Sequence, residues 1–299
     1  MKFNIHCRKI VAPSITWTTM SFRIEDLQSA YHTYNEFIAH KPENHHERFI
    51  FPFFAGSYFS YRMVDVLRVV AIANSISSNP KYVDVGCGYG DFLCRIRQFL
   101  PNAIGIEQDG SIFYMFHRPK PTYIYSSYEE WYCLGPFDLS FVGWMQPGMD
   151  FRKSVSRFTK CVVTTFDSGG QCGVIGGCEY EEFGFQKLAW WRTPSWIDVN
   201  CELMNRFYTH SLKTDKNKMD LLAGLRTAHN FWYVYTKPEI SDQVRDCLRG
   251  WLIKEKEEGI YLKHRFGFES VLDECGFRYM ETLKSLFSKG NQLWQVEFD

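Results

Sequence analysis

Residues 83–93 read VDVGCGYGDFL, and this stretch decides the fold class. A short apolar run ends at Gly86, glycines alternate as far as Gly90, and a helical pattern begins at Asp91. Glycine has no Cβ, so the backbone at such positions can turn tightly and approach a ligand closely. A glycine-rich turn between a strand and a helix is typical of α/β domains that bind ligands at the carboxyl ends of parallel strands.

An acidic residue follows the next apolar run at a suitable spacing. Glu107 comes directly after residues 103–106, seventeen positions beyond Gly90. A carboxylate at the end of the second strand can accept hydrogen bonds from both hydroxyls of a ribose. The fingerprint for NAD or FAD, G-x-G-x-x-G, would need a third glycine at position 91. Asp91 stands there and would bring a negative charge near a pyrophosphate, so the pattern disfavours a dinucleotide.

Further apolar runs alternate with short helical patterns, as in a parallel sheet built from βαβ units. After residue 167 this alternation breaks, although strand-like runs occur at 188–191 and 231–235. We expect the other elements at these places: helices over 22–40, 58–76 and 268–275, an amphipathic stretch over 241–257, and strands over 82–85, 103–106, 123–125, 137–142, 161–166, 277–283 and 293–298.

The block around Gly88 resembles motif I of the class I S-adenosylmethionine-dependent methyltransferases. The match consists of Asp84, Gly86, Gly88, Gly90 and Glu107. Residues 137–139 also resemble that family's entry to strand four, and 268–277 and 293–298 resemble its closing helix and hairpin. The resemblance covers about 81–167 and 266–299.

The resemblance implies a Rossmann-like, mostly parallel seven-stranded sheet of order 3-2-1-4-5-7-6, with strand 7 antiparallel. N-terminal helices would precede the sheet, and a large insertion would follow strand 5. The chain would then divide into four parts. These are an N-terminal helical extension or lid (1–80), the cofactor-binding half (81–167), an acceptor-binding cap that covers the carboxyl edge (168–265), and a closing helix and β-hairpin (266–299).

S-adenosylmethionine is the cofactor that this resemblance implies. Its expected contacts are Asp84, Gly86, Cys87, Gly88, Tyr89, Gly90, Glu107, Gln108, Ser126 and Ser127. Ser126 and Ser127 stand where the family often has an acid near the adenine; capping the next helix is an equally good interpretation of both. The Asn/Asp-Pro-Pro-Tyr/Phe motif does not follow strand four, which disfavours N-methylation of adenine or of glutamine by that motif's route.

Residues just past strands four and five should face the ligand in such a sheet. This nominates Trp144, Met145 and Asp167 as candidate catalytic residues. Asp167 is the only ionisable one of the three, and capping a helix is its alternative role. The tryptophans of the expected cap are either its core or an acceptor pocket: Trp190, Trp191, Trp196 and Trp232.

The amino-acid composition favours some classes of binding partner over others. The chain has 299 residues, 34 basic and 34 acidic, and 17% of them are aromatic. Overall neutrality disfavours a nucleic-acid-coated surface, and aromatic side chains suit a small-molecule or peptide-like acceptor. A methyltransferase that acts on RNA and a non-catalytic cofactor-binding scaffold are the alternatives.

No apolar run is long enough to span a membrane, and the N-terminus has no apolar signal region. The ten cysteines contain no C-x-x-C pair, so we expect reduced thiols, no metal site and a cytoplasmic location.

Overall fold

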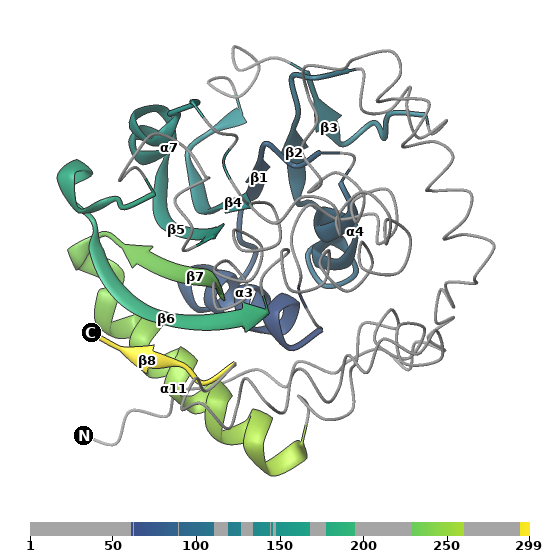
Figure 1. The fold of residues 1–299 in the computed structure, drawn as a ribbon. Coiled ribbons are helices and arrows are strands. Elements are labelled where there is room, and N and C mark those ends of the chain that lie inside the picture. Colours follow the sequence, from purple (N-terminus) through teal and green to yellow (C-terminus); the bar gives the residue numbers. More distant parts are fainter. Residues whose placement is uncertain are drawn as a thin grey trace, which may run out of the picture.

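A computed structural model describes the chain over residues 61, 63–88, 90–110, 119–126, 134–143, 145, 148–167, 178–194, 229–259 and 294–299. These residues form one eight-stranded sheet with helices on both faces (Figure 1). The strand order is β3-β2-β1-β4-β5-β7-β6-β8. The fold is therefore Rossmann-like, and its first seven positions have the expected order 3-2-1-4-5-7-6.

Five strands run parallel and supply the half of the sheet that carries the glycine turn. They are β1 (Tyr82–Val85), β2 (Ile104–Ile106), β3 (Ile124–Tyr125), β4 (Phe137–Gly143) and β5 (Thr159–Asp167). β7 (His229–Thr236) is antiparallel to β5 and to β6 (Gln186–Pro194), as expected for strand 7. β8 (Glu297–Phe298) adds an eighth, antiparallel strand beside β6.

The sixth and seventh strands come from a different part of the chain than the sequence predicts. β6 and β7 lie within 168–265, which we expected to form a cap over the carboxyl edge. For the described parts of that segment this was wrong, because they continue the sheet beyond β5. Leu188 and Trp191 of β6 and Trp232 of β7 are fully buried, so these strands belong to the core. The predicted strand 277–283 and helix 268–275 lie outside the described residues.

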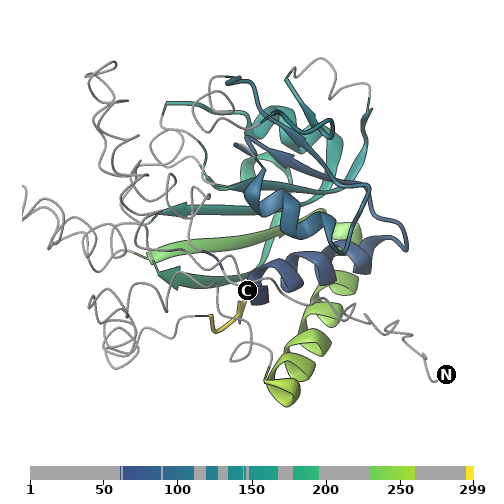
Figure 2. The same cartoon turned by 90° about the vertical axis from the view of Figure 1, so that its right-hand side faces the viewer.

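Within the described residues, three helices cover one face of the sheet and one short helix covers the other. Side chains of α3 (Met63–Ile76), α4 (Asp91–Arg97) and α11 (Ser241–Glu258) form one core cluster with the sheet. Figure 2 shows α3 and α11 lying against each other on this face. Val155 of α7 (Arg152–Phe158) belongs to the second cluster, on the opposite face. The 3-10 helices η3 (Glu181–Phe183) and η4 (Pro238–Ile240) precede β6 and α11.

α3 is a core helix, so the expectation that 58–76 forms part of a lid was wrong. Every residue from Met63 to Ala73 is buried, and the helix packs against α11, α4 and β4. A helix that is apolar on nearly all sides must be covered on all sides. The predicted helix 22–40 lies outside the described residues.

Two charged side chains of α3, Asp65 and Arg68, form hydrogen bonds inside this core. Arg68 makes a two-pronged ion pair with Glu255 of α11, at 3.0 and 2.6 Å, and donates to the Trp294 carbonyl at 2.8 Å. Asp65 accepts hydrogen bonds from the indoles of Trp191 at 2.8 Å and Trp294 at 3.2 Å. The network ties α3, α11, β6 and the C-terminal segment together. In the described part of the chain, no helix is long and apolar enough to cross a membrane.

Candidate functional site

The candidate site lies at the carboxyl edge of the parallel strands, where β1 and β2 end beside each other. Three glycines follow β1 in the left-handed region, with φ values of 71° at Gly86, 57° at Gly88 and 84° at Gly90. Side chains rarely adopt this conformation, so a turn of this shape requires glycine. Gly90 is also sterically restricted, because a Cβ there would lie 2.7 Å from Cδ1 of Ile124 on β3.

Backbone hydrogen bonds hold the turn against β2. The amides of Gly86 and Cys87 both donate to the Ile106 carbonyl, at 2.9 and 3.1 Å. The Gly90 amide donates to the Cys87 carbonyl at 3.0 Å. The turn is therefore a fixed part of the sheet edge.

Glu107 is the charged group next to this turn. Its Oε2 accepts a 2.8 Å hydrogen bond from the Gly88 amide, and its Oε1 accepts one of 2.9 Å from the Asp109 amide. The Glu107 amide itself donates to the Tyr125 carbonyl at 2.9 Å, which fixes the backbone against β3. A carboxylate has about four lone-pair sites for hydrogen bonds, and this side chain is half-buried.

A second acid lies beneath the turn. Asp84 of β1 is 2% exposed. Burial and the nearby charge of Glu107 raise the pKa of Asp84 well above its ordinary value. Burial also raises the pKa of Glu107, against the lowering effect of the Asp109 and Gly88 amides. The half-buried Glu107 side chain beside a glycine-rich turn forms an acceptor site that suits a hydroxyl-rich ligand.

The other predicted cofactor residues differ in their burial and in their distance along the chain from the glycine turn. Cys87 is half-buried in the turn, and burial raises the pKa of its thiol well above the ordinary value. Gln108 is exposed next to Glu107. Ser126 is exposed directly after β3, and its hydroxyl accepts a hydrogen bond from Lys120 Nζ. Tyr89 and Ser127 lie outside the described residues.

The candidate catalytic residues flank the same edge. Asp167 is the last residue of β5 and lies opposite Asn230 of β7. Met145 follows β4 and is 2% exposed, packed into the second core cluster. Trp144 lies outside the described residues.

For two of the four tryptophans, the structure decides between a place in the core and a place in an acceptor pocket. Trp191 and Trp232 are fully buried and stack with their centroids 5.3 Å apart, so they belong to the core of the sheet. Trp190 is half-buried, with the Arg192 guanidinium 4.9 Å from its ring centroid. Trp196 lies outside the described residues.

Sequence reasoning missed two aromatic residues at the glycine turn. Cζ of Phe151 lies 3.8 Å from the position that a Cβ on Gly86 would take. The Tyr61 hydroxyl donates to Asp91 in the first turn of α4, and its ring packs edge-on against Phe92 at 4.9 Å. Neither residue is near the turn in sequence, so no spacing pattern could have found them.

Comparison with known proteins found no matching family model and no matching curated protein. Several solved structures resemble the fold. A protein described as a sarcosine dimethylglycine methyltransferase from Galdieria sulphuraria is 12% identical, with a TM-score of 0.43 over 58% of this chain and 84% of that one. A cyclopropane synthase from Mycobacterium tuberculosis is 11% identical, with a TM-score of 0.41 over the same shares.

A phosphoethanolamine N-methyltransferase from Haemonchus contortus, solved with S-adenosyl-L-methionine, is 12% identical. Its TM-score is 0.38 over 58% of this chain and 52% of that one. All three TM-scores lie below 0.5.

Proposed function

We propose that this chain is an S-adenosylmethionine-dependent methyltransferase, of class EC 2.1.1, that acts on a small-molecule or peptide-like acceptor. One observation carries the proposal. The half-buried carboxylate of Glu107 lies at the end of β2, joined by a 2.8 Å hydrogen bond to the glycine turn that ends β1. An acceptor-only group beside a glycine-rich turn is suited to a ribose bound across parallel strands.

The sheet order sets the direction in which the cofactor would lie. If the ribose binds at Glu107, the adenine extends toward β3, where Ser126 and Ser127 follow the strand. The methionine end then crosses the glycine turn toward β4, on the other side of β1. Asp84, Gly86, Cys87, Gly88, Tyr89, Gly90 and Gln108 complete the proposed contacts.

The geometry of the turn also supports this cofactor over a dinucleotide. Asp91 takes the place of the third glycine in the dinucleotide fingerprint, and its carboxylate is held by the Tyr61 hydroxyl. A fixed negative charge there would oppose a pyrophosphate, whereas S-adenosylmethionine carries no phosphate.

When bound, the cofactor would supply a sulfonium methyl group for in-line displacement. The residues of the chain would hold the acceptor in line with that methyl and keep water out, which is a task of proximity and orientation. A general base is needed only for a weakly nucleophilic acceptor. Asp167, at the end of β5, is the candidate base, and Trp144 and Met145, after β4, are candidates for shaping the site.

Aromatic side chains support an acceptor with a planar or apolar part. Phe166 of β5 stacks on Phe231 of β7 with centroids 5.7 Å apart, and both are half-buried near the carboxyl end of β5. The guanidinium of Arg192 lies 5.3 Å from the Phe231 ring centroid. Such rings suit a compact acceptor, while the neutral chain does not favour an RNA duplex.

Calorimetric titration with S-adenosylmethionine, S-adenosylhomocysteine and NAD tests the proposal. We expect saturable binding of the first two and none of NAD. Glu107→Ala and Gly88→Val should abolish this binding, while Glu239→Ala, an exposed acid in η4, should leave it unchanged. Binding of NAD alone, or binding that survives Glu107→Ala, would refute the proposed cofactor site.

A methyl-labelled cofactor then separates the remaining classes. Label transfer to small molecules or peptides is expected. Transfer to RNA, with binding that weakens steeply as salt rises, would favour the nucleic-acid alternative. Cofactor binding without formation of S-adenosylhomocysteine would favour the scaffold alternative. The cytoplasmic location stays a prediction, which cell fractionation tests.

A further inference from the structure

Phe151 lies close to the first glycine of the turn. It follows β4 and directly precedes α7, and its Cζ lies 3.8 Å from the Cβ position of Gly86. The ring is half-buried, whereas Gly86 is exposed. The ring therefore borders an exposed part of the turn, and it packs against the second core cluster.

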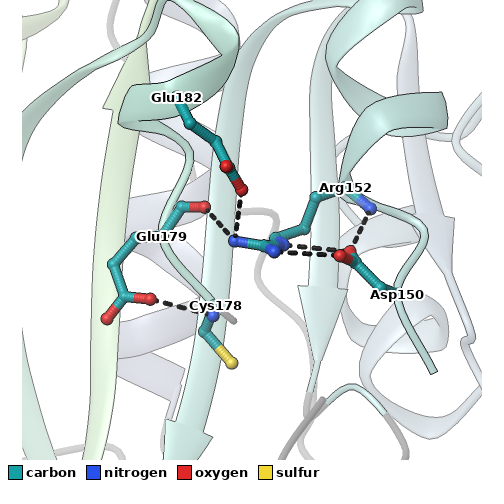
Figure 3. A network of polar contacts seen from close by, with 5 residues as sticks. All are labelled: Asp150, Arg152, Cys178, Glu179 and Glu182. Carbon is teal, nitrogen blue, oxygen red and sulfur yellow. Dashed lines mark hydrogen bonds and ion pairs between the residues drawn. The ribbon is translucent and has the colours of Figure 1, made fainter. Parts of the chain in front are cut away.

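The backbone on both sides of Phe151 is held by its two neighbours. Arg152 Nε and Nη2 donate to Oδ1 and Oδ2 of Asp150, each at 2.9 Å (Figure 3). The Arg152 amide also donates to Asp150 Oδ1 at 3.1 Å. A two-pronged guanidinium–carboxylate pair has a defined geometry, so it fixes the direction of the residue between its members.

The same guanidinium anchors this loop to the chain that leads into β6. Arg152 Nη1 donates to the Glu179 carbonyl at 2.8 Å and pairs with Oε1 of Glu182 at 3.0 Å. Glu179 in turn accepts a 3.0 Å hydrogen bond from the Cys178 amide through its own carboxylate, as Figure 3 shows. The Arg152 side chain is 9% exposed. The loop that carries Phe151 is thus held by a largely buried guanidinium whose carboxylate partners are partly exposed.

We infer that Phe151 forms the wall of the cofactor site at the sulfonium, and that Arg152 is the residue that positions it. The inference rests on the proposed function, since the ribose at Glu107 directs the rest of the cofactor across the turn toward β4. An aromatic face attracts a cation that has lost part of its water. Phe151 should therefore stabilise the charged S-adenosylmethionine and contribute much less to the neutral S-adenosylhomocysteine.

The ratio of the two dissociation constants tests this inference, because a merely structural role would change both together. In Phe151→Leu we expect S-adenosylmethionine to bind about five-fold more weakly, with S-adenosylhomocysteine unchanged. Phe151→Tyr keeps an aromatic face and should restore the wild-type ratio. Phe151→Met, whose flexible unbranched side chain can fill an irregular gap, replaces the Leu variant if melting curves show that the latter unfolds.

Arg152 is tested through its effect on Phe151. Arg152→Gln should shift the ratio in the same direction, and the double variant Phe151→Leu/Arg152→Gln should shift it no further than Phe151→Leu does. Lys160→Gln is the matched control, because it removes an exposed ion pair with Asp138 at the other end of β4. Its ratio should stay at the wild-type value.

The outcomes separate the inference from the proposed function. If wild type binds both ligands and Phe151→Leu weakens both equally, or neither, the placement of Phe151 at the sulfonium is wrong while the cofactor site stands. Additive effects of Phe151→Leu and Arg152→Gln would overturn the positioning role. If wild type binds neither ligand, or Glu107→Ala binds as tightly as wild type, the proposed function fails and the inference fails with it.

Discussion

The backbone amide of Gly88 donates a 2.8 Å hydrogen bond to Oε2 of Glu107, so the glycine turn after β1 and the acid that ends β2 are directly joined. Nineteen positions separate these residues along the chain. The parallel pairing of β1 with β2, in which Val85 lies opposite Ile106, brings them together. Ligand binding at this edge and the stability of the edge are therefore linked.

Glu107→Gln should separate the structural role of this side chain from its proposed role in binding. A glutamine carbonyl can still accept from the Gly88 amide, and only the acceptor for the exposed Asp109 amide is lost, so the melting temperature should fall only slightly. The charged acceptor for a ribose is lost, and the affinity for S-adenosylmethionine should fall about ten-fold or more. Calorimetry and a melting curve measure the two effects. Wild-type affinity in this variant would contradict the role of the charge.

Asp84→Asn should stabilise the ligand-free protein at neutral pH. The folded-state pKa of Asp84 is raised by burial and by Glu107, so the folded protein holds this proton more tightly than the unfolded chain does. The free energy of unfolding of wild type should therefore fall as pH rises from the ordinary aspartate pKa toward the raised one. In Asp84→Asn the side chain at position 84 does not titrate, so this decrease in the free energy of unfolding should be absent.

Urea unfolding at several pH values checks the prediction for Asp84. The advantage of Asp84→Asn should be largest at neutral pH and should shrink as the pH falls to about 4, where the aspartate of both states is becoming protonated. An advantage that does not change with pH would show that the effect has another cause.

Removing one member of the Arg68–Glu255 ion pair should lower the free energy of unfolding strongly, whereas replacing both members with apolar residues should lower it less. Arg68→Met leaves the carboxylate of Glu255 buried without its partner, and we expect a loss of about 3–5 kcal/mol in the free energy of unfolding. The double variant Arg68→Met/Glu255→Leu should be less destabilised than Arg68→Met. Denaturant unfolding of both variants measures this.

The control for these variants is an exposed ion pair on α11, the helix that carries Glu255. Lys254 and Glu258 form an exposed ion pair at 3.8 Å, and Lys254→Met should change the stability by only about 0.5 kcal/mol or less. If Arg68→Met were as mild as Lys254→Met, the buried pair would contribute nothing.

Gly105→Ala should strain the contact between β2 and the glycine turn. The added Cβ would lie 2.6 Å from both Cys87 Sγ and Leu93 Cδ2, and we expect a loss of about 1–3 kcal/mol. Cys87→Ala removes one of the two clashing atoms, so it should recover part of the loss in the double variant. Gly110→Ala is the control, because the space around it is open. Unfolding in denaturant measures all four proteins, and equal losses at 105 and 110 would contradict the clash.

Patterns that are local in sequence predicted the first half of the sheet well. The strand–turn–helix pattern at 82–97 depends on short apolar runs, positive-φ glycines and a helical stretch, and each of these acts on near neighbours. The five parallel strands, the antiparallel seventh strand and the order of the first seven positions follow the expectation.

The identity of strands six and seven could not be obtained in this way. Residues 186–194 and 229–236 have the apolar runs of strands, but thirty-four residues separate them, outside the described part of the chain. Whether such runs extend the sheet or form a cap depends on whether they pair with the edge of β5. That pairing is a contact between distant segments, so a local sequence pattern cannot predict it. The burial of α3 was missed for the same reason, since α11 and the C-terminal segment that cover it are distant in sequence.

By itself, the sequence determined the glycine turn, the placement of Glu107 and the parallel order around them, because backbone conformation and strand pairing between near neighbours depend on local residue types. Only the tertiary structure decided that Phe151 borders Gly86, that Arg152 donates to the Glu179 carbonyl, and that Asp65 accepts hydrogen bonds from the indoles of Trp191 and Trp294. These contacts join residues dozens to hundreds of positions apart. They arise when packing the two faces of the sheet brings such segments within a few ångströms of one another.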